Sequence, residues 1–495
     1  MSEPKDMTEQ GRLESALSNF RVRLSALKHD PVLKEIFSLV RREGVRAYLV
    51  GGVLRNIALS REVIPDYDFA VGGDVEAFSA KVADRLKGSS FLLDKETLSC
   101  RVVVKSDSTE YMLDFSPVKS DDIYYDLKAR DFTMNAMGVE VVQLFEGEPE
   151  IIDPCGGFQD SAENLLRAAS KDAFDEDPLR CLRAIRLSQQ YGLEIEEETL
   201  ELIKAKSELV SGTSAERVRE ETVLMFSSPN TGTSLKRLYD TGIVKVILPE
   251  INDWADVDGY NLLSHTLNTL EEAEKLLSNI SEKTFPQLSE NLKTHFSGFE
   301  GSIKKEAFFK MAAFFHDFGK PYAISREQGR LRFIGHDFEG SRHIVEVLTR
   351  LKFSRRVINE LANLIKNHHR VFMFAVLAQP SFRAKSHFFR AVGGEAGLDL
   401  LCLALADARA TRGGEDEELY KIVLGLMRFY YEVYIKEKPR PLIGGDDIME
   451  TFGILPGRLV GEILSEVSRG VETGIINNRK QALEHIRKWL KGKKK

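Results

Sequence analysis

Two carboxylates, Asp66 and Asp68, are separated by a single residue in the largely apolar run 66–71. In a β-strand alternate side chains point to the same face, so this spacing predicts that both carboxylates project together. Adjacent carboxylates repel each other unless a cation neutralises them, and Mg²⁺ prefers such oxygen ligands. The pair therefore predicts a divalent-metal site; the alternative interpretation is a solvated strand edge.

A pair of glycines precedes this strand. Gly51 and Gly52 follow a predicted strand at 47–50, and Arg55 lies three residues further on. Glycine allows backbone N–H groups to approach a phosphate closely, and an arginine can bind the phosphate charge. Together with the carboxylate pair, this turn predicts a nucleotidyl-transfer site.

A third carboxylate, Asp114, lies in the second of two further predicted strands. We expect these strands at 102–104 and 111–115, with a turn at 105–109 between them. Three carboxylates can hold two metal ions about 4 Å apart, and such a pair stabilises the attacking and the leaving oxygen together. The alternative interpretation of Asp114 is a turn residue at a strand end.

The next polar segment, 129–137, is predicted to open a helix. Its Arg130 could bind phosphate oxygens or ribose, and Asn135 could hydrogen-bond to a sugar hydroxyl. The alternative places both residues at a helix cap or on the surface.

A second helix is predicted to start around Pro178, because proline fits the first turn of a helix and acidic residues precede it. Asp177 and Arg180 are three residues apart and would share a helical face. Together they offer an acceptor and a forked donor that could address the edge of a base. An ion pair within the helix is the alternative.

In combination, these motifs resemble those of the class II tRNA nucleotidyltransferase and bacterial poly(A) polymerase family. The resemblance covers residues 30–250, in the family's order and spacing. Its motifs are Gly-Gly-x-x-Arg at 51–55, Asp-x-Asp at 66–68, Arg-Asp-Phe-Thr-x-Asn-Ala at 130–136, Asp-Pro-x-Gly-Gly at 153–157 and Glu-Asp-Pro-Leu-Arg at 176–180.

The resemblance implies a role for each matching residue. Metal ions would bind to Asp66 and Asp68, together with Asp114. The expected nucleotide-binding residues are Gly51, Gly52 and Arg55 for the triphosphate, Arg130, Asp131 and Asn135 for ribose and phosphate, and Asp177, Arg180, Arg183 and Arg186 around the base. In this family the protein acts as the template, so the base would be chosen by hydrogen-bond geometry.

The chain departs from the family pattern at two positions. Asn56 stands where the family usually has aspartate, and Ala129 replaces the first of two arginines. Asn56 is expected to support the loop rather than to take part in catalysis. Ala129 removes one positive contact. Together, the two changes could restrict the activity to only part of CCA synthesis.

Histidines in the second half of the chain indicate a second chemistry. His316-Asp317 follows the apolar run 311–315, and Asp407 lies on a later predicted helix. Histidine nitrogen with aspartate oxygen suits a divalent transition metal, and a helical bundle can bring such ligands together. With His265 these residues resemble an HD phosphohydrolase domain, in which His336, His368 and His369 could complete a second metal position. His343 is expected to be structural.

Composition sets the remaining limits. The chain has 495 residues, a net charge of −7 and a pI of about 5.9, so RNA binding would need a local basic patch. Two candidates are the arginines at 180, 183, 186, 217 and 219 and the lysine-rich tail 479–495. No apolar run approaches the ~18 residues of a membrane span, and no signal-peptide pattern is present at the N-terminus. Four scattered cysteines indicate a reducing, cytoplasmic location without membrane association.

The predicted fold class is α+β, with a small α/β nucleotidyltransferase head followed by an all-α body that contains an HD domain. The expected segments are a helical leader (1–30), the head (31–165), a helical neck for base selection and RNA binding (166–250), the HD domain (251–435) and a helical, basic tail (436–495). A flexible loop is expected within 88–110.

The expected function is template-independent addition of CCA, or of its C or A part, to tRNA 3′ ends from CTP and/or ATP with Mg²⁺. A poly(A) polymerase with the same head is one alternative. A metal-dependent HD phosphohydrolase with a degenerate RNA-binding head is another; its substrate could be 2′,3′-cyclic phosphate or 2′-phosphorylated RNA ends. The sequence leaves open the nucleotide added and the oligomeric state.

Overall fold

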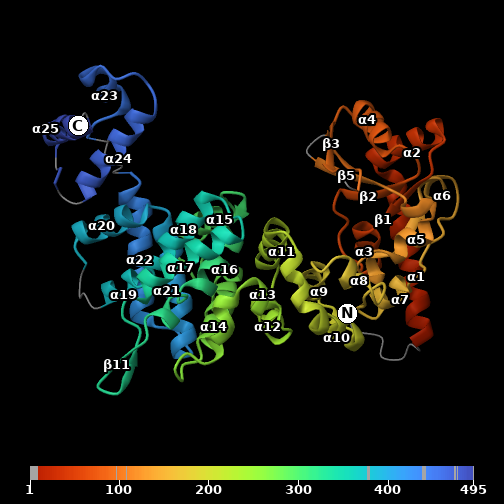
Figure 1. The fold of residues 1–495 in the computed structure, drawn as a ribbon, viewed down its shortest axis with the longest axis horizontal. Coiled ribbons are helices and arrows are strands. Elements are labelled where there is room, and N and C mark those ends of the chain that lie inside the picture. Colours follow the sequence, from red (N-terminus) through yellow and green to blue (C-terminus); the bar gives the residue numbers. More distant parts are fainter. Residues whose placement is uncertain are drawn as a thin grey trace. The chain divides into compact units, whose positions relative to one another are not determined.

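The computed structural model describes residues 9–95, 97–106, 109–375, 380–436, 442–472, 475–476 and 478–493. The chain forms two compact units, residues 1–252 and 253–495, which are described separately (Figure 1).

A six-stranded mixed sheet with the strand order β3-β4-β5-β2-β1-β6 organises the first unit. Its strands are β1 (Ala47–Val50), β2 (Asp66–Val71), β3 (Ser89–Asp94), β4 (Ser99–Ser106), β5 (Thr109–Pro117) and β6 (Gly138–Glu140). Only β2 and β5 are parallel; the other neighbouring pairs are antiparallel. The central strands are therefore the ones that carry the three predicted carboxylates.

Helices cover this sheet and then continue as a helical region. They are α1 (Glu9–Ala26), α2 (Pro31–Glu43), α3 (Gly52–Ala58), α4 (Val75–Leu86), α5 (Ile123–Lys128), α6 (Val141–Glu146), α7 (Gly157–Ala162), α8 (Ala173–Glu176), α9 (Arg180–Tyr191), α10 (Glu197–Lys206), α11 (Ala215–Ser227), α12 (Thr231–Asp240) and α13 (Ile243–Ile247). The hydrophobic core joins α1, α2 and α4 to the inner strands, for example through Phe20, Ile36, Phe69, Phe78 and Phe115.

Local signals explain the boundaries of α2. Asp30 caps its N-terminus, since the carboxylate accepts hydrogen bonds from the N–H groups of Val32 and Leu33, and Pro31 occupies the first turn. Gly44 adopts the left-handed conformation that ends the helix. The apolar face of α2 is thereby fixed against the sheet.

The second unit is helical around the predicted metal ligands. Its helices are α14 (Leu262–Ser278), α15 (Ser289–Phe296), α16 (Lys305–Phe315), α17 (His336–Arg350), α18 (Arg355–Asn367), α19 (Arg370–Ala375), α20 (Phe382–Val392), α21 (Ala396–Arg412), α22 (Glu417–Phe429), α23 (Gly445–Phe452), α24 (Arg458–Glu472) and α25 (Arg479–Lys493). The last three share a separate hydrophobic core that includes Ile448, Ile463 and Ile486.

The predicted fold class is confirmed, with local corrections. The segment after residue 165 is not purely helical, because three short ladders occur: β7 (Leu165–Leu166) with β8 (Glu194–Ile195), β9 (Phe299–Glu300) with β10 (Ile303–Lys304), and β11 (Ser325–Glu327) with β12 (Arg330–Arg332). Within 88–110, where a flexible loop is expected, residues 89–94 and 99–106 form β3 and β4 of the sheet, and the mobility of a loop in this range stays a prediction; residues 96, 107 and 108 lie outside the described ranges.

The prediction that 129–137 opens a helix is wrong. The segment contains only a 3₁₀ turn at Thr133–Asn135, followed directly by β6. The Asp131 carboxylate accepts a hydrogen bond from the Phe132 N–H and another from the Asn135 side chain, and these bonds compete with helical ones. The helix predicted to start around Pro178 is α9, which begins at Arg180, so Asp177 precedes it and does not share a helical face with Arg180.

Candidate functional site

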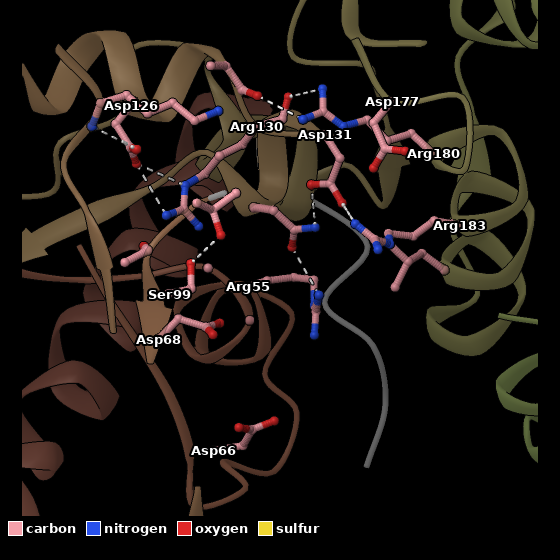
Figure 2. Close-up of a pocket in the computed structure, with 18 of the residues that line it drawn as sticks. Arg55, Asp66, Asp68, Ser99, Asp126, Arg130, Asp131, Asp177, Arg180 and Arg183 are labelled. Carbon is pink, nitrogen blue, oxygen red and sulfur yellow. Dashed lines mark hydrogen bonds and ion pairs between the residues drawn. The ribbon is translucent and has the colours of Figure 1, made fainter. Parts of the chain in front are cut away.

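The three predicted carboxylates lie on the two parallel strands at the centre of the sheet. Register places Asp68 of β2 directly opposite Asp114 of β5, and Asp66 lies two residues before Asp68 on the same face. Figure 2 shows Asp66 and Asp68 on one side of a cavity, with Asp177, Arg180 and Arg183 across it. The fold thus brings together carboxylates that are 48 positions apart in the sequence, Asp66 and Asp114.

Partial burial and mutual repulsion favour a cation at this carboxylate cluster, in which Asp66 is exposed and Asp68 and Asp114 are half-buried. Burial raises the pKa of Asp68 to about 6, and repulsion from Asp114 and Asp66 adds to the shift. The pKa of Asp66 is also raised, first by burial and then by Asp114. The cluster is therefore short of positive charge, and its oxygen donors fit Mg²⁺.

A cation from the protein already contacts the third carboxylate. Arg101 of β4 donates two hydrogen bonds of 2.7 Å to the two oxygens of Asp114. Arg101 was not predicted as a site residue, although a hairpin through the turn predicted at 105–109 would set it opposite Asp114.

The glycine turn lies against the carboxylates. Gly51 has φ of 74°, in the left-handed region, and α3 starts directly after it. A Cβ atom on Gly51 would be 2.7 Å from Oδ2 of Asp68 and 3.3 Å from Nη1 of Arg130. Any side chain here would fill the space beside the carboxylate, which leaves backbone groups to contact a ligand.

Arg55 lies behind this turn in a network of neutral partners. Its guanidinium donates to Oδ1 of Asn135 at 2.9 Å and to the Tyr191 hydroxyl at 2.6 Å. It also donates to Oδ1 of Asn56, and burial lowers the pKa of Arg55. Asn56 thus orients this arginine within α3, and its own Nδ2 donates to the Glu62 carbonyl at 3.5 Å; that Asn56 supports the loop stays a prediction.

Arg130 and Asp131 point in different directions. Nη2 of Arg130 lies 3.3 Å from Oδ2 of Asp126, four residues earlier in the chain. This partner was not predicted. Asp131 is buried and accepts a hydrogen bond from Arg183 at 3.2 Å. Burial opposes ionisation of Asp131, but Arg183 and Asn135 outweigh it and lower the pKa.

The predicted base-selecting residues have separate partners. Asp177 accepts a 2.7 Å hydrogen bond from Arg217, and Arg180 donates to the carbonyls of Ala129, Arg130 and Ala173. The alternative of an ion pair between Asp177 and Arg180 is therefore not observed.

Behind them Glu221 of α11, also missed from the sequence, accepts hydrogen bonds from Arg183 at 3.0 Å and Arg186 at 2.7 Å. These pairs fix α9 against α11.

A cavity of about 800 Å³ is lined by most of these groups; among the described residues, Asp114 and its partner Arg101 are not part of its lining. Its lining includes all the predicted nucleotide-binding residues, the carboxylates Asp66 and Asp68, and Thr97 and Ser99 at the β3–β4 turn. The cavity is large enough for a nucleotide, with Asp66 and Asp68 at one side and Asp177, Arg180 and Arg183 across it.

The second unit brings the predicted histidines into two adjoining groups. In the first, Nε2 of His265 and Nε2 of His316 lie 3.0 and 3.1 Å from Oδ2 of Asp317. Asp407 completes this group, since its Oδ1 is 3.4 Å from His265 and 3.8 Å from His316.

The second group uses the other oxygen of the same aspartate. Nε2 of His336 is 3.0 Å and Nε2 of His368 is 3.6 Å from Oδ1 of Asp317. Nε2 of His369 lies 3.1 Å from that of His336. Asp317 is therefore placed to bridge two metal ions, and the nitrogen-rich donor set fits divalent transition metals.

Backbone carbonyls orient three of these rings. The distance from Nδ1 to the carbonyl oxygen is 2.9 Å between His316 and Ala313, 2.7 Å between His336 and Phe333, and 2.6 Å between His368 and Ile365. Each Nδ1 then carries the proton, which leaves the Nε2 lone pair for a metal.

Two further contacts define the limits of this centre. Nζ of Lys320 lies 2.6 Å from Oδ2 of Asp317, so a metal ion would compete with this lysine for the same oxygen. His343 lies outside both groups and stacks on Tyr322 at 3.8 Å between ring centroids. Its expected structural role fits this placement.

Comparisons with known proteins agree with this architecture. Three family models match: the poly A polymerase head domain over 47–167, a probable RNA and SrmB-binding site of polymerase A over 192–255, and the HD domain over 262–412. A CCA-adding enzyme of Thermotoga maritima in complex with tRNA shares the fold, with a TM-score of 0.55 at 22% identity over 95% of this chain and 98% of that chain.

Curated relatives extend over nearly the whole chain. An A-adding tRNA nucleotidyltransferase of Deinococcus radiodurans is 29% identical over 90% of this chain and 95% of its own length. A CC-adding enzyme of Geobacter sulfurreducens is 29% identical over 94% and 97%. A multifunctional CCA protein of Neisseria gonorrhoeae is 30% identical over 66% and 74%.

The fold and its carboxylate cluster define a nucleotidyltransferase head joined to a helical body with an HD domain. The chain belongs to the tRNA nucleotidyltransferase and poly(A) polymerase family. The family identified from the sequence motifs is thereby confirmed.

Proposed function

We propose that the chain adds nucleotides from CTP and/or ATP to the 3′ end of tRNA, completing CCA or its C or A part. The main supporting observation is the register of β2 and β5, which sets Asp68 opposite Asp114, with Asp66 on the same face of β2. The similar proteins include both A-adding and CC-adding tRNA nucleotidyltransferases, which supports tRNA as the acceptor and leaves the choice of nucleotide open.

The residues of the cavity divide the work of the reaction. The N–H groups of the Gly51–Gly52 turn, with Arg55 and Arg130, bind and orient the triphosphate. Asp131, Asn135 and Arg183 hold the sugar side of the cavity in place through their mutual hydrogen bonds. The RNA 3′ hydroxyl gives up its proton to water, its oxygen forms a bond to the α-phosphorus in line, and the bond to pyrophosphate breaks.

Asp66, Asp68 and Asp114 would hold Mg²⁺, which when bound activates a hydroxyl and neutralises departing phosphate charge. Asp177 and Arg180 would read the incoming base. Both oxygens of Asp177 already accept a hydrogen bond, from Arg217 and from the Leu179 N–H, and each retains a further lone pair. Arg217 would thus hold Asp177 in the orientation needed for reading.

Single-nucleotide incorporation tests the proposal. The substrates are tRNA transcripts ending before CCA, after C and after CC, with an unstructured RNA as control. We expect self-limiting addition to tRNA alone, which Asp68→Asn abolishes with folding intact. Long adenylate tails on every RNA would instead support a poly(A) polymerase, and substantial transfer by the variant would refute the site.

We further propose that the second unit is a phosphohydrolase that uses a divalent transition metal. The observation in favour is the pair of histidine groups that share Asp317. The expected substrates are phosphate esters such as 2′,3′-cyclic phosphate or 2′-phosphorylated RNA ends. Metal content after purification, together with hydrolysis of these esters by the protein and by Asp317→Asn, tests this activity; hydrolysis unchanged in the variant would exclude the centre.

The remaining assignments are parts of the same proposal. The proposed functional segments are the head, neck, HD domain and tail, at residues 31–165, 166–250, 251–435 and 436–495. The scattered free cysteines support a cytoplasmic location. Within the described ranges, the model contains no helix whose length and hydropathy would let it span a membrane.

A further inference from the structure

A groove between α19 and α20 in the second unit lies outside both candidate centres. It has a volume of about 460 Å³ and a floor of Phe374 and Phe388, whose rings are 5.5 Å apart. Met373, which is 67% exposed, forms part of the wall together with Ala384. The groove is therefore wide, apolar and open to solvent.

The polar side chains around this groove are cationic or neutral. Arg370, Arg383 and His387 line it, and its lining contains no carboxylate. Among the residues that the structure describes, no ion pair or hydrogen bond joins any of these three side chains to an acidic group. In a chain with a net charge of −7, such an uncompensated basic rim indicates an anionic ligand.

The arginines expected to contact RNA are placed differently. Arg183 and Arg186 both pair with Glu221, and Arg217 pairs with Asp177. Their charges are already partly neutralised within the protein. The cationic rim of the groove keeps its full charge for a partner.

We propose that this groove binds a single-stranded RNA segment, with a base against the apolar floor and phosphates on Arg370 and Arg383. Proteins bind unpaired nucleotides by combining contacts to the base faces with cations that bind the phosphates. Here Met373, together with the edges of the largely buried Phe374 and Phe388, offers the apolar surface. The helix face fits this arrangement, since Arg383 and His387 are one turn apart and Ala384 and Phe388 lie beside them. Spacing along α20 therefore sets its half of the rim and of the floor, and Arg370 and Phe374 of α19 supply the other half.

The groove also adjoins the histidine centre. Arg370 directly follows His369 in the sequence, and the rings of His369 and Phe372 lie 6.0 Å apart. An RNA end held in the groove would thus lie near the bridging Asp317 group. Binding itself requires neither nucleotidyl transfer nor hydrolysis, so it can be tested when both activities are absent.

The test measures binding of a fluorescein-labelled, unstructured RNA hexamer by anisotropy, using the full chain in EDTA without nucleotides. We compare Arg370→Gln/Arg383→Gln with the control Lys293→Gln/Lys421→Gln, which removes the same charge from exposed sites on α15 and α22. The groove variant is expected to lower the slope of log K against log salt by about 1.4, at ~0.7 for each lost phosphate contact. An unchanged slope would overturn the proposal.

Two additional variants separate base binding from charge. Ala384→Phe fills the groove and keeps the arginines, so it should weaken binding about fivefold or more, the lower range for losing one base stack. Arg383→Gln alone removes one charge from the rim and leaves Arg370, the residue next to His369, unchanged. A polyglutamate peptide that binds as tightly as the RNA would show a general anion patch and contradict the proposal.

Discussion

Arg101 and Asp114 show how one residue pair can tune the candidate transferase site. The guanidinium occupies both oxygens of the third carboxylate, and it is the nearest cation that a metal ion must displace. The pKa of Arg101 is raised, chiefly by its hydrogen bonds to Asp114. Arg101 therefore remains charged throughout the working range.

We predict that Arg101→Gln increases the affinity of the site for a divalent cation. Removing a positive charge next to three carboxylates lowers the electrostatic cost of binding a metal cation there. Titration with Mn²⁺, followed by the loss of its free-ion EPR signal, measures this affinity. Arg85→Gln, which breaks an exposed ion pair with Glu35, is the matched control and should leave it unchanged. Equal or weaker Mn²⁺ binding would contradict the prediction.

Asp131 links the nucleotide cavity to acid stability. Since its pKa is lower in the folded chain than in the unfolded chain, its ionised form stabilises the fold above about pH 4, and this contribution is lost as the pH falls further. Asp131→Asn should cost about 3 kcal/mol at pH 7, because Arg183 loses a buried partner.

Urea unfolding of the wild type and Asp131→Asn at pH 7 and pH 3.5 checks the sign of this effect. The difference between the two proteins should shrink at the lower pH. A difference that stays constant would show that packing, and not charge, sets the role of Asp131.

At the scale of elements, one glycine contact positions the shared aspartate relative to α17. A Cβ on Gly319 would lie 1.9 Å from the His336 carbonyl and 2.3 Å from the Gly340 N–H nitrogen. Such close approach requires glycine, because backbone atoms cannot move aside as a flexible side chain can. The turn after Asp317 is thus locked to the start of α17, where His336 lies.

We predict that Gly319→Ala destabilises the second unit by about 2–3 kcal/mol and lowers its metal content. Gly425→Ala, in the exposed middle of α22 with open space around its Cβ position, is the control. Metal analysis of the purified proteins and thermal unfolding provide the measurements. Full metal content in Gly319→Ala would show that His336 does not depend on this contact.

The secondary structure could be predicted best where local patterns decided it. The strands at 47–50 and 66–71 were predicted to the residue, because alternation and flanking turn signals agree there. The segment 129–137 was not, since Asp131 and Asn135 bond to each other and interrupt the helix that their neighbours favour.

For the whole molecule, the two compact units predict separable activities. Asp68→Asn should remove nucleotidyl transfer and retain ester hydrolysis, whereas Asp317→Asn should do the reverse. Chelation followed by addition of Mg²⁺ alone should restore transfer first, because oxygen ligands favour Mg²⁺ and the histidine groups do not. Parallel assays on each variant check this, and joint loss of both activities with an intact fold would contradict it.

The sequence by itself determined the family, the order of head and HD domain, and the residue types that could do chemistry. These follow from motifs whose spacing is local. The pairing of residues distant in sequence was decided only by the tertiary structure: Arg101 on Asp114, Glu221 under Arg183 and Arg186, and Asp317 between two histidine groups. Such contacts depend on strand register and helix packing, because they join residues whose separation along the chain carries no signal of their distance in space.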